Sequence, residues 1–219
     1  GIEELVSYAR PHGTWVMLDL YHSFMAMPCD FSAVADRVFL TGGGYKYAMS
    51  GEGVGYLHAP PGYGPRPSNT GWFAEFSAIE GKHNSVAYGE DGLRYLGATY
   101  EVTGLYRFNA VQAMLAANKL DTAAITQRIA PLRANLVAAI EAGDAGVLRE
   151  AQVLKPNATD PQSRFISLKH PSATQWKARL FDANAITDAR DDVLRIGLGI
   201  YHDEPDIAAF CVAAAKTLG

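Results

Sequence analysis

The stretch Thr41-Gly42-Gly43-Gly44-Tyr45-Lys46-Tyr47 places one lysine directly after three glycines and between two tyrosines. The apolar run Arg37-Val38-Phe39-Leu40 precedes it, and this order predicts a strand that the glycines end. A partly buried lysine on such a loop keeps a neutral amine that can form a Schiff base with an aldehyde cofactor. The simpler interpretation is a solvated loop lysine, since most lysines are exposed. A phosphate-binding P-loop is excluded, because tyrosine stands on each side of the lysine where that motif requires glycine and serine or threonine.

A second apolar run, Trp15-Val16-Met17-Leu18-Asp19-Leu20, predicts a buried strand with one carboxylate near its C-terminal end. Ligands of open α/β sheets bind outside the carboxyl ends of the strands, so Asp19 and Lys46 could face one ligand. A carboxylate there can keep a pyridinium nitrogen protonated. A helix cap or a satisfied core acid is an equally good interpretation of Asp19. His22, three residues on, could contact the same ligand, although a lone histidine is more often packed in a core.

The composition is that of a globular protein and excludes several functions. The 219 residues are 48% hydrophobic and 19% charged, with a mean hydropathy of -0.04 and a net charge of -4. No basic run offers a surface for nucleic acid, no apolar window has the length of a membrane span, and the residues from Gly1 to Glu4 do not resemble a signal peptide. We therefore expect a cytoplasmic protein without nucleic-acid or membrane partners. Cys29 and Cys211 lie far apart, which predicts core thiols and neither a disulfide nor a metal site.

The order of predicted elements indicates an α/β fold followed by a smaller α+β part. The first 120 residues alternate helix and strand and then enter a helical connector. Residues 121–219 contain that connector's second helix, strands and two further helices. The expected helices are 2–10, 105–120, 122–142, 172–183 and one from 206 onward, with a helical turn at 32–36; the expected strands are 15–20, 37–40, 53–58, 165–168 and two short ones around 191–192. Asp121 and Ser172 are the predicted helix caps.

Several short motifs occur in one shared order. They are Asp19-Leu20-Tyr21-His22-Ser23, Ala35-Asp36-Arg37, Gly43-Gly44-Tyr45-Lys46-Tyr47, Gly51-Glu52-Gly53-Val54, Thr70-Gly71-Trp72-Phe73, Leu96-Gly97-Ala98-Thr99, Asp188-Ala189-Arg190 and Leu194-Arg195-Ile196-Gly197. Together they resemble the class V aminotransferase family of fold-type I pyridoxal phosphate (PLP) enzymes, and within it the kynureninase-like subgroup. The resemblance implies a large PLP-binding domain, with a mainly parallel sheet, that ends near residue 120, and a small C-terminal α+β domain over 121–219.

The resemblance also implies a role for individual residues. Lys46 would hold PLP as a Schiff base and move the substrate's Cα proton. Asp19 would pair with the pyridinium nitrogen, His22 would lie beside the ring, and Tyr45 would donate to the cofactor phosphate. Arg195 would bind the substrate carboxylate, a task suited to its planar fork. Without the resemblance, Arg195 is best interpreted as one side of an ion pair at a strand edge.

Two further positions are implied to contact the cofactor. Trp72 matches an aromatic near the substrate or near a neighbouring subunit's phosphate, and a core tryptophan is the alternative. Thr99 resembles the threonine of a Gly-Thr pair that reaches the partner subunit's phosphate, but Ala98 interrupts that pair. The implied enzyme is a homodimer acting on an amino acid.

The resemblance predicts that this chain is the C-terminal part of a longer enzyme and that it binds PLP poorly alone. A preceding segment of the same enzyme would supply the phosphate-binding loop. Kynureninase-like hydrolytic cleavage, transamination and elimination all stay open. Cysteine desulfurase is disfavoured, because Cys29 precedes the lysine and Cys211 lies in the predicted last helix. The alternative from another class is a non-catalytic oligomerisation module.

Overall fold

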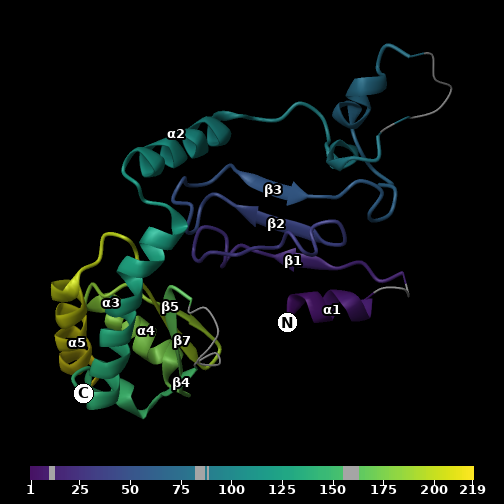
Figure 1. Cartoon of the computed structure of the whole chain (residues 1–219). Coiled ribbons are helices and arrows are strands. Elements are labelled where there is room, and N and C mark those ends of the chain that lie inside the picture. Colours follow the sequence, from purple (N-terminus) through teal and green to yellow (C-terminus); the bar gives the residue numbers. More distant parts are fainter. Residues whose placement is uncertain (10–12, 82–86, 88, 155–162) are drawn as a thin grey trace. The chain divides into compact units, whose positions relative to one another are not determined.

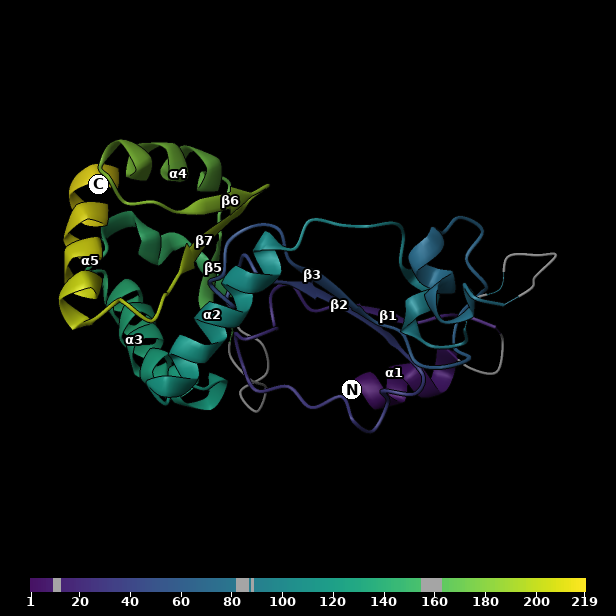
Figure 2. The ribbon, with the colours of Figure 1, turned by 90° about the horizontal axis from the view of Figure 1, so that it is seen from above.

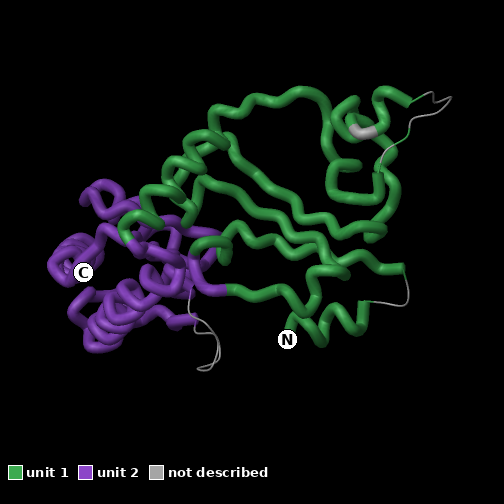
Figure 3. The backbone as a smooth tube through the Cα atoms, turned by 45° about the horizontal axis from the view of Figure 1, so that its top comes forward, with its two compact units in different colours: residues 1–25, 29–118 green, residues 26–28, 119–219 purple. Residues whose placement is uncertain are grey.

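The computed structural model describes residues 1–9, 13–81, 87, 89–154 and 163–219 (Figure 1). The chain divides into two compact units, which are described separately below (Figure 3). Unit 1 consists of residues 1–25 and 29–118, and unit 2 of residues 26–28 and 119–219. That these units are the large and small domains of a longer PLP enzyme stays a prediction.

Unit 1 is built around a three-stranded sheet (Figure 2). Its elements are α1 (Ile2–Ala9), β1 (Met17–Asp19), β2 (Phe39–Gly43), β3 (Gly55–His58), the 3-10 helices η1 (Trp72–Ala78) and η2 (Gly92–Tyr95), and α2 (Thr103–Ala117). The strand order is β1-β2-β3, with β1 parallel to β2 and β3 antiparallel to β2. The parallel pair has Asp19 opposite Thr41, so both strands end at the same edge of the sheet.

The expectation that the first strand is buried is wrong. β1 is an edge strand, and its side chains alternate between two environments. Leu18 packs with Val16 toward a core around Val6, Val34 and Val38, whereas Met17 and Asp19 are exposed. Because successive side chains of a strand point to opposite faces, burying Leu18 leaves its two neighbours on the other face.

The sequence predicted that the glycines end the second strand, and this prediction is wrong for Gly42 and Gly43. β2 continues through Gly42 and Gly43, which pair with Tyr56 and Gly55 of β3. The third strand starts later than expected, because Gly53 has a φ of +97° that lies outside strand conformations. The predicted helical turn at 32–36 is present only as turns.

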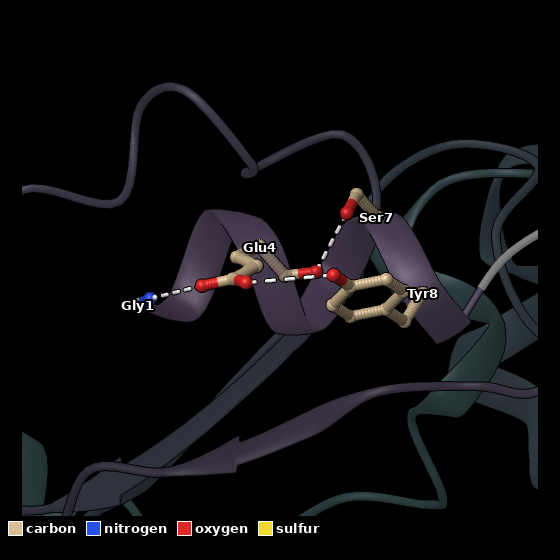
Figure 4. A network of polar contacts seen from close by, with 4 residues as sticks. All are labelled: Gly1, Glu4, Ser7 and Tyr8. Carbon is tan, nitrogen blue, oxygen red and sulfur yellow. Dashed lines mark hydrogen bonds and ion pairs between the residues drawn. The ribbon is translucent and has the colours of Figure 1, made fainter.

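Helix α1 covers one side of the sheet through Val6 and carries a small polar network on its outer side (Figure 4). The Glu4 carboxylate accepts from the Gly1 amino group at 3.1 Å and from the Tyr8 hydroxyl at 3.5 Å. Ser7 Oγ donates to the Glu4 carbonyl at 2.6 Å. These exposed contacts occupy the outer face, so the inner face is left to the core.

Unit 2 is an α+β arrangement of a four-stranded antiparallel sheet and three helices. Its elements are α3 (Thr122–Ala142), the 3-10 helix η3 (Gly146–Glu150), β4 (Gln152–Leu154), β5 (Phe165–Lys169), α4 (Ala173–Asp182), β6 (Asp188–Arg190), β7 (Val193–Gly197) and α5 (Glu204–Leu218). The strand order is β4-β5-β7-β6. Helices and sheet share one core that includes Leu136, Ile166, Trp176 and Leu194.

The helix starts of unit 2 test the predicted caps. Asp121 caps α3, since its side chain accepts from the Ala124 N–H at 2.7 Å. Ser172 precedes α4 but makes no side-chain cap bond, and its backbone (φ -85°, ψ 6°) lacks the extended conformation typical of an N-cap. Of the helices that the structure describes, none is long and apolar enough to cross a membrane.

Candidate functional site

The site forms where β1 and β2 end side by side. Asp19 is the last residue of β1, and its Oδ1 accepts from the Tyr21 N–H at 2.9 Å. This turn leads directly into His22. The sequence predicted Asp19 near the end of one strand and Lys46 after a later one, and β1 and β2 pair in parallel with Asp19 opposite Thr41. That Asp19 and Lys46 face one ligand stays a prediction. Asp19 is exposed rather than buried, so its carboxylate is accessible to a ligand.

Lys46 and His22 meet at this edge. Lys46 Nζ lies 3.0 Å from His22 Nε2. The lysine is partly buried and the histidine exposed. At this distance one nitrogen donates a proton to the other, and which of them carries it depends on the histidine tautomer and on both charges.

Two tyrosines flank the lysine. Lys46 Nζ lies 5.4 Å from the ring centre of Tyr21 and 5.6 Å from that of Tyr45. The two rings are themselves 5.5 Å apart. Aromatic faces stabilise a nearby ammonium group. Sequence reasoning selected Tyr45 but missed Tyr21, although its place next to His22 was a usable signal.

The glycines make room for aromatic rings and for the turn that follows. A Cβ on Gly42 would lie 2.6 Å from the Tyr56 hydroxyl, and one on Gly43 would lie 2.6 Å from the Tyr21 ring. A Cβ on Gly44 would lie 2.4 Å from Ser50 Oγ. No other residue fits at these positions without displacing a neighbour, so the three glycines are explained by close packing.

Trp72 and Thr99 lie in neighbouring segments, for which the structure gives no contact with Lys46. Trp72 begins η1, is 46% exposed, and its ring centre is 4.5 Å from that of Phe73. The Phe73 N–H donates to the Gly97 carbonyl at 3.1 Å, which holds η1 beside the segment that carries Thr99. Thr99 itself is exposed. Their cofactor contacts stay predictions.

Arg195 lies in unit 2, on β7. It donates through Nη2 to Asp188 Oδ2 of β6, directly opposite in the strand register. This confirms the ion pair that the sequence suggested. The Arg195 hydrogen bond lowers the pKa of the Asp188 carboxyl, with burial opposing that effect. That Arg195 binds a substrate carboxylate stays a prediction.

Neither cysteine approaches the described site residues through a contact given by the structure. Cys211 is buried in α5, as expected for a core thiol, whereas Cys29 is exposed, contrary to expectation. Although Cys29 lies at the surface, partial burial of the thiol raises its pKa above the ordinary value. Burial also raises the pKa of the Cys211 thiol. Among the residues described, no cluster of three or more histidine, cysteine, aspartate or glutamate side chains could hold a metal ion.

Comparison with known proteins gives a fold and no family. No family model and no curated protein matches the chain. A cysteine desulfurase from Thermococcus onnurineus NA1 is 18% identical over 98% of this chain and 55% of that chain, with a TM-score of 0.71. The cysteine desulfurase CsdA from Escherichia coli is 16% identical over 99% of this chain and 54% of that chain, with a TM-score of 0.70. An SPT variant solved with PLP is 14% identical over 99% of this chain and 50% of that chain, with a TM-score of 0.59.

These likenesses confirm the predicted fold class. The chain has the mixed α/β architecture of PLP-transferase fold-type I structures. It spans about half the length of the solved structures that it matches. At identities below one fifth, the likeness carries the fold and leaves activity to be argued from the site.

Proposed function

We propose that this chain is part of a PLP-dependent enzyme that acts on an α-amino acid, with Lys46 as the residue that binds PLP covalently. The observation that carries the proposal is the 3.0 Å contact of Lys46 Nζ with His22 Nε2, at the edge where β1 ends in Asp19. A lysine amine reacts with an aldehyde only when it is neutral. An imidazole at hydrogen-bond distance can hold the amine in place and exchange a proton with it during the reaction.

The residues of this edge fit the cofactor chemically. Lys46 Nζ and His22 Nε2 are in contact, and the exposed Asp19 ends β1 three residues before His22. A carboxylate, an amine and an imidazole match the protonated ring nitrogen, the aldehyde and the aromatic ring of PLP. PLP, when bound, acts as an electron sink for the substrate's Cα. Asp19 would hold the proton of the ring nitrogen, His22 would orient the ring, and Tyr45 would donate to the phosphate. Lys46 Nζ would then hold and return the Cα proton.

For the reaction subtype we propose kynureninase-like hydrolytic cleavage between Cβ and Cγ. The ordered motifs around Asp19, His22, Lys46 and Trp72 support it. Transamination and elimination are the nearest alternatives. Two solved neighbours are cysteine desulfurases, but Cys29 precedes Lys46 and Cys211 is buried in α5, so the chain offers no thiol placed for that reaction after the lysine.

We further propose that the working enzyme is a homodimer of a longer chain. The structural neighbours are about twice as long. The resemblance assigns Thr99 to the partner subunit's phosphate, and Trp72 either to the substrate side chain or to that phosphate. On this proposal the present 219 residues alone bind PLP weakly and are inactive. The rival is a non-catalytic module that keeps the fold for oligomerisation.

Product analysis separates these possibilities. The full-length protein is incubated with PLP and a panel of amino acids that includes kynurenine, and products are identified by mass spectrometry, with Lys46→Ala as control. Release of an aromatic acid and alanine supports hydrolytic cleavage, an oxo acid supports transamination, and both must disappear in the control. If the folded, PLP-treated protein converts no amino acid in the panel, the module is favoured.

A further inference from the structure

The turn that follows Lys46 adopts an unfavourable backbone conformation. Within five residues it contains three positive φ angles, at Met49 (+56°), Gly51 (+68°) and Gly53 (+97°). A methionine in the left-handed region is strained, because its Cβ approaches the following carbonyl. Such a turn keeps one shape only if its surroundings hold it there.

The base of the turn is closed by its own backbone and one serine. The N–H and Oγ of Ser50 both donate to the Gly44 carbonyl at 2.9 Å. The Met49 N–H donates to the Lys46 carbonyl at 3.1 Å. Ser50 is 2% exposed, so this closure is shielded from water. These bonds hold the first part of the turn. The Ser50 and Glu52 carbonyls, on either side of Gly51, take no part in them.

Arg107 of α2 binds these two carbonyls. Its Nε donates to the Ser50 carbonyl and its Nη2 donates to the Glu52 carbonyl. One guanidinium therefore bridges the carbonyls of the two residues on either side of Gly51. A planar fork with fixed N–H directions suits two separate acceptors, whereas a lysine at this position would offer a single flexible ammonium.

The same face of α2 fits closely against the turn. A Cβ on Gly104 would lie 2.5 Å from the Gly53 carbonyl oxygen, so only glycine allows the helix this near. Phe108 packs beside Gly44, and Gln112 Nε2 donates to the Ala48 carbonyl at 3.4 Å. Positions 104, 107, 108 and 112 repeat with helical spacing, so one face of α2 lies along the turn.

We propose that Arg107 is a positioning residue for Lys46: by bridging the Ser50 and Glu52 carbonyls it holds the strained turn that aims Lys46 Nζ at His22. The consequence for PLP chemistry rests on the proposed function of Lys46, whereas the consequence for the turn does not. Loss of the bridge frees the turn, and the lysine then samples positions away from the imidazole.

The variants are Arg107→Ala and Arg107→Lys, with Arg128→Ala as matched control. Arg128 also donates through Nε and Nη2 to two backbone carbonyls, those of Ile200 and His202 at 3.0 Å, but it lies in unit 2. Three measurements are compared in the full-length protein: hydrogen exchange of backbone amides 44–54, acylation of Lys46 by an amine reagent as a function of pH, and borohydride-trapped PLP on Lys46.

In Arg107→Ala, exchange over 44–54 should rise about thirtyfold, the change expected from losing two hydrogen bonds of ordinary net strength. The β1 and β3 amides should keep their protection. The pH profile of Lys46 acylation should shift, and trapped PLP at a fixed PLP concentration should fall severalfold. Arg107→Lys should restore part of each loss, and Arg128→Ala should match the wild type in all three.

Unchanged exchange and unchanged Lys46 acylation in Arg107→Ala would overturn the proposal. Loss of protection throughout unit 1, equal to its loss over 44–54, would also overturn it, because Arg107 would then be a general stabilising residue. If exchange and acylation change as expected while even the wild type traps no PLP, the positioning role is supported and the proposed function fails.

Discussion

Lys46 and His22 touch through their side-chain nitrogens at 3.0 Å, although 24 positions separate them in the chain. Parallel strands β1 and β2 produce this contact, because their carboxyl ends reach the same edge of the sheet. In this pair, His22 Nε2 is a possible proton acceptor beside the Lys46 amine. Replacing His22 with Phe should therefore slow covalent attachment of PLP at neutral pH by about a hundredfold or more, within the range for lost proton transfer.

The measurement for His22→Phe is the initial rate of borohydride-trappable PLP. His22→Gln, which keeps a polar side chain, should retain more of the rate than His22→Phe. Equal rates in the wild type and both variants would show that the histidine does not assist the amine.

Gly43→Ala should destabilise unit 1. The new methyl group would lie 2.6 Å from the Tyr21 ring and 2.9 Å from the Val54 carbonyl oxygen. Overpacking of this kind costs about 1–3 kcal/mol in unfolding free energy. Urea denaturation measures the difference, with Gly97→Ala as control, because a Cβ at Gly97 meets nothing within 4 Å. Equal stability of the two variants would contradict the packing explanation for the glycines.

Asp188→Asn should weaken unit 2 at neutral pH and have no effect in acid. The hydrogen bond from Arg195 lowers the pKa of Asp188 in the folded state, so its ion pair stabilises the protein above the carboxyl's ordinary pKa. That contribution is lost as the pH falls through the folded-state value. Because Asp188 is half exposed, the loss at neutral pH should be about 0.2–1 kcal/mol.

Thermal unfolding measured from neutral to acidic pH checks this, since the difference between the wild type and Asp188→Asn should shrink as the carboxyl is protonated in the folded state. A difference in melting temperature between the wild type and Asp188→Asn that grows as the pH falls would contradict this prediction.

Asp121→Ala should destabilise α3 by about 1 kcal/mol, the usual effect of removing an N-cap side chain. Ser172→Ala is the natural comparison, because Ser172 precedes α4 without a side-chain cap bond. Chemical denaturation followed by circular dichroism should show the larger loss for Asp121→Ala. A larger loss for Ser172→Ala would mean that the serine hydroxyl stabilises the helix in another way.

The sequence predicted the parts of the site that depend on strand order. Asp19 lies near the end of one apolar run and Lys46 follows another, and β1 and β2 pair in parallel as that order allows. Local pattern was a poorer guide to burial: β1 is an edge strand, so Asp19 is exposed. Gly42 and Gly43 suggested a strand end because glycine commonly interrupts strands. Glycine is needed at these positions because the rings of Tyr56 and Tyr21 pack against them, and only the folded chain brings those rings near.

Arg107 could not be predicted from the sequence in the same way. Helical spacing gives the face on which a side chain lies, but it does not tell which distant carbonyl an arginine meets. The Arg107 partners, Ser50 and Glu52, lie more than fifty positions earlier. The Ser172 cap failed for a related reason, because residue type alone does not show that the backbone at that helix start departs from the extended N-cap conformation.

The proposed function depends most on Lys46 as the residue that takes PLP. The direct measurement is borohydride reduction of the full-length protein incubated with PLP, followed by peptide mapping of the modified lysine. We expect one phosphopyridoxyl group, on the peptide that contains Lys46, and none in Lys46→Arg. Modification of a different lysine, or equal modification in Lys46→Arg, would contradict the central claim.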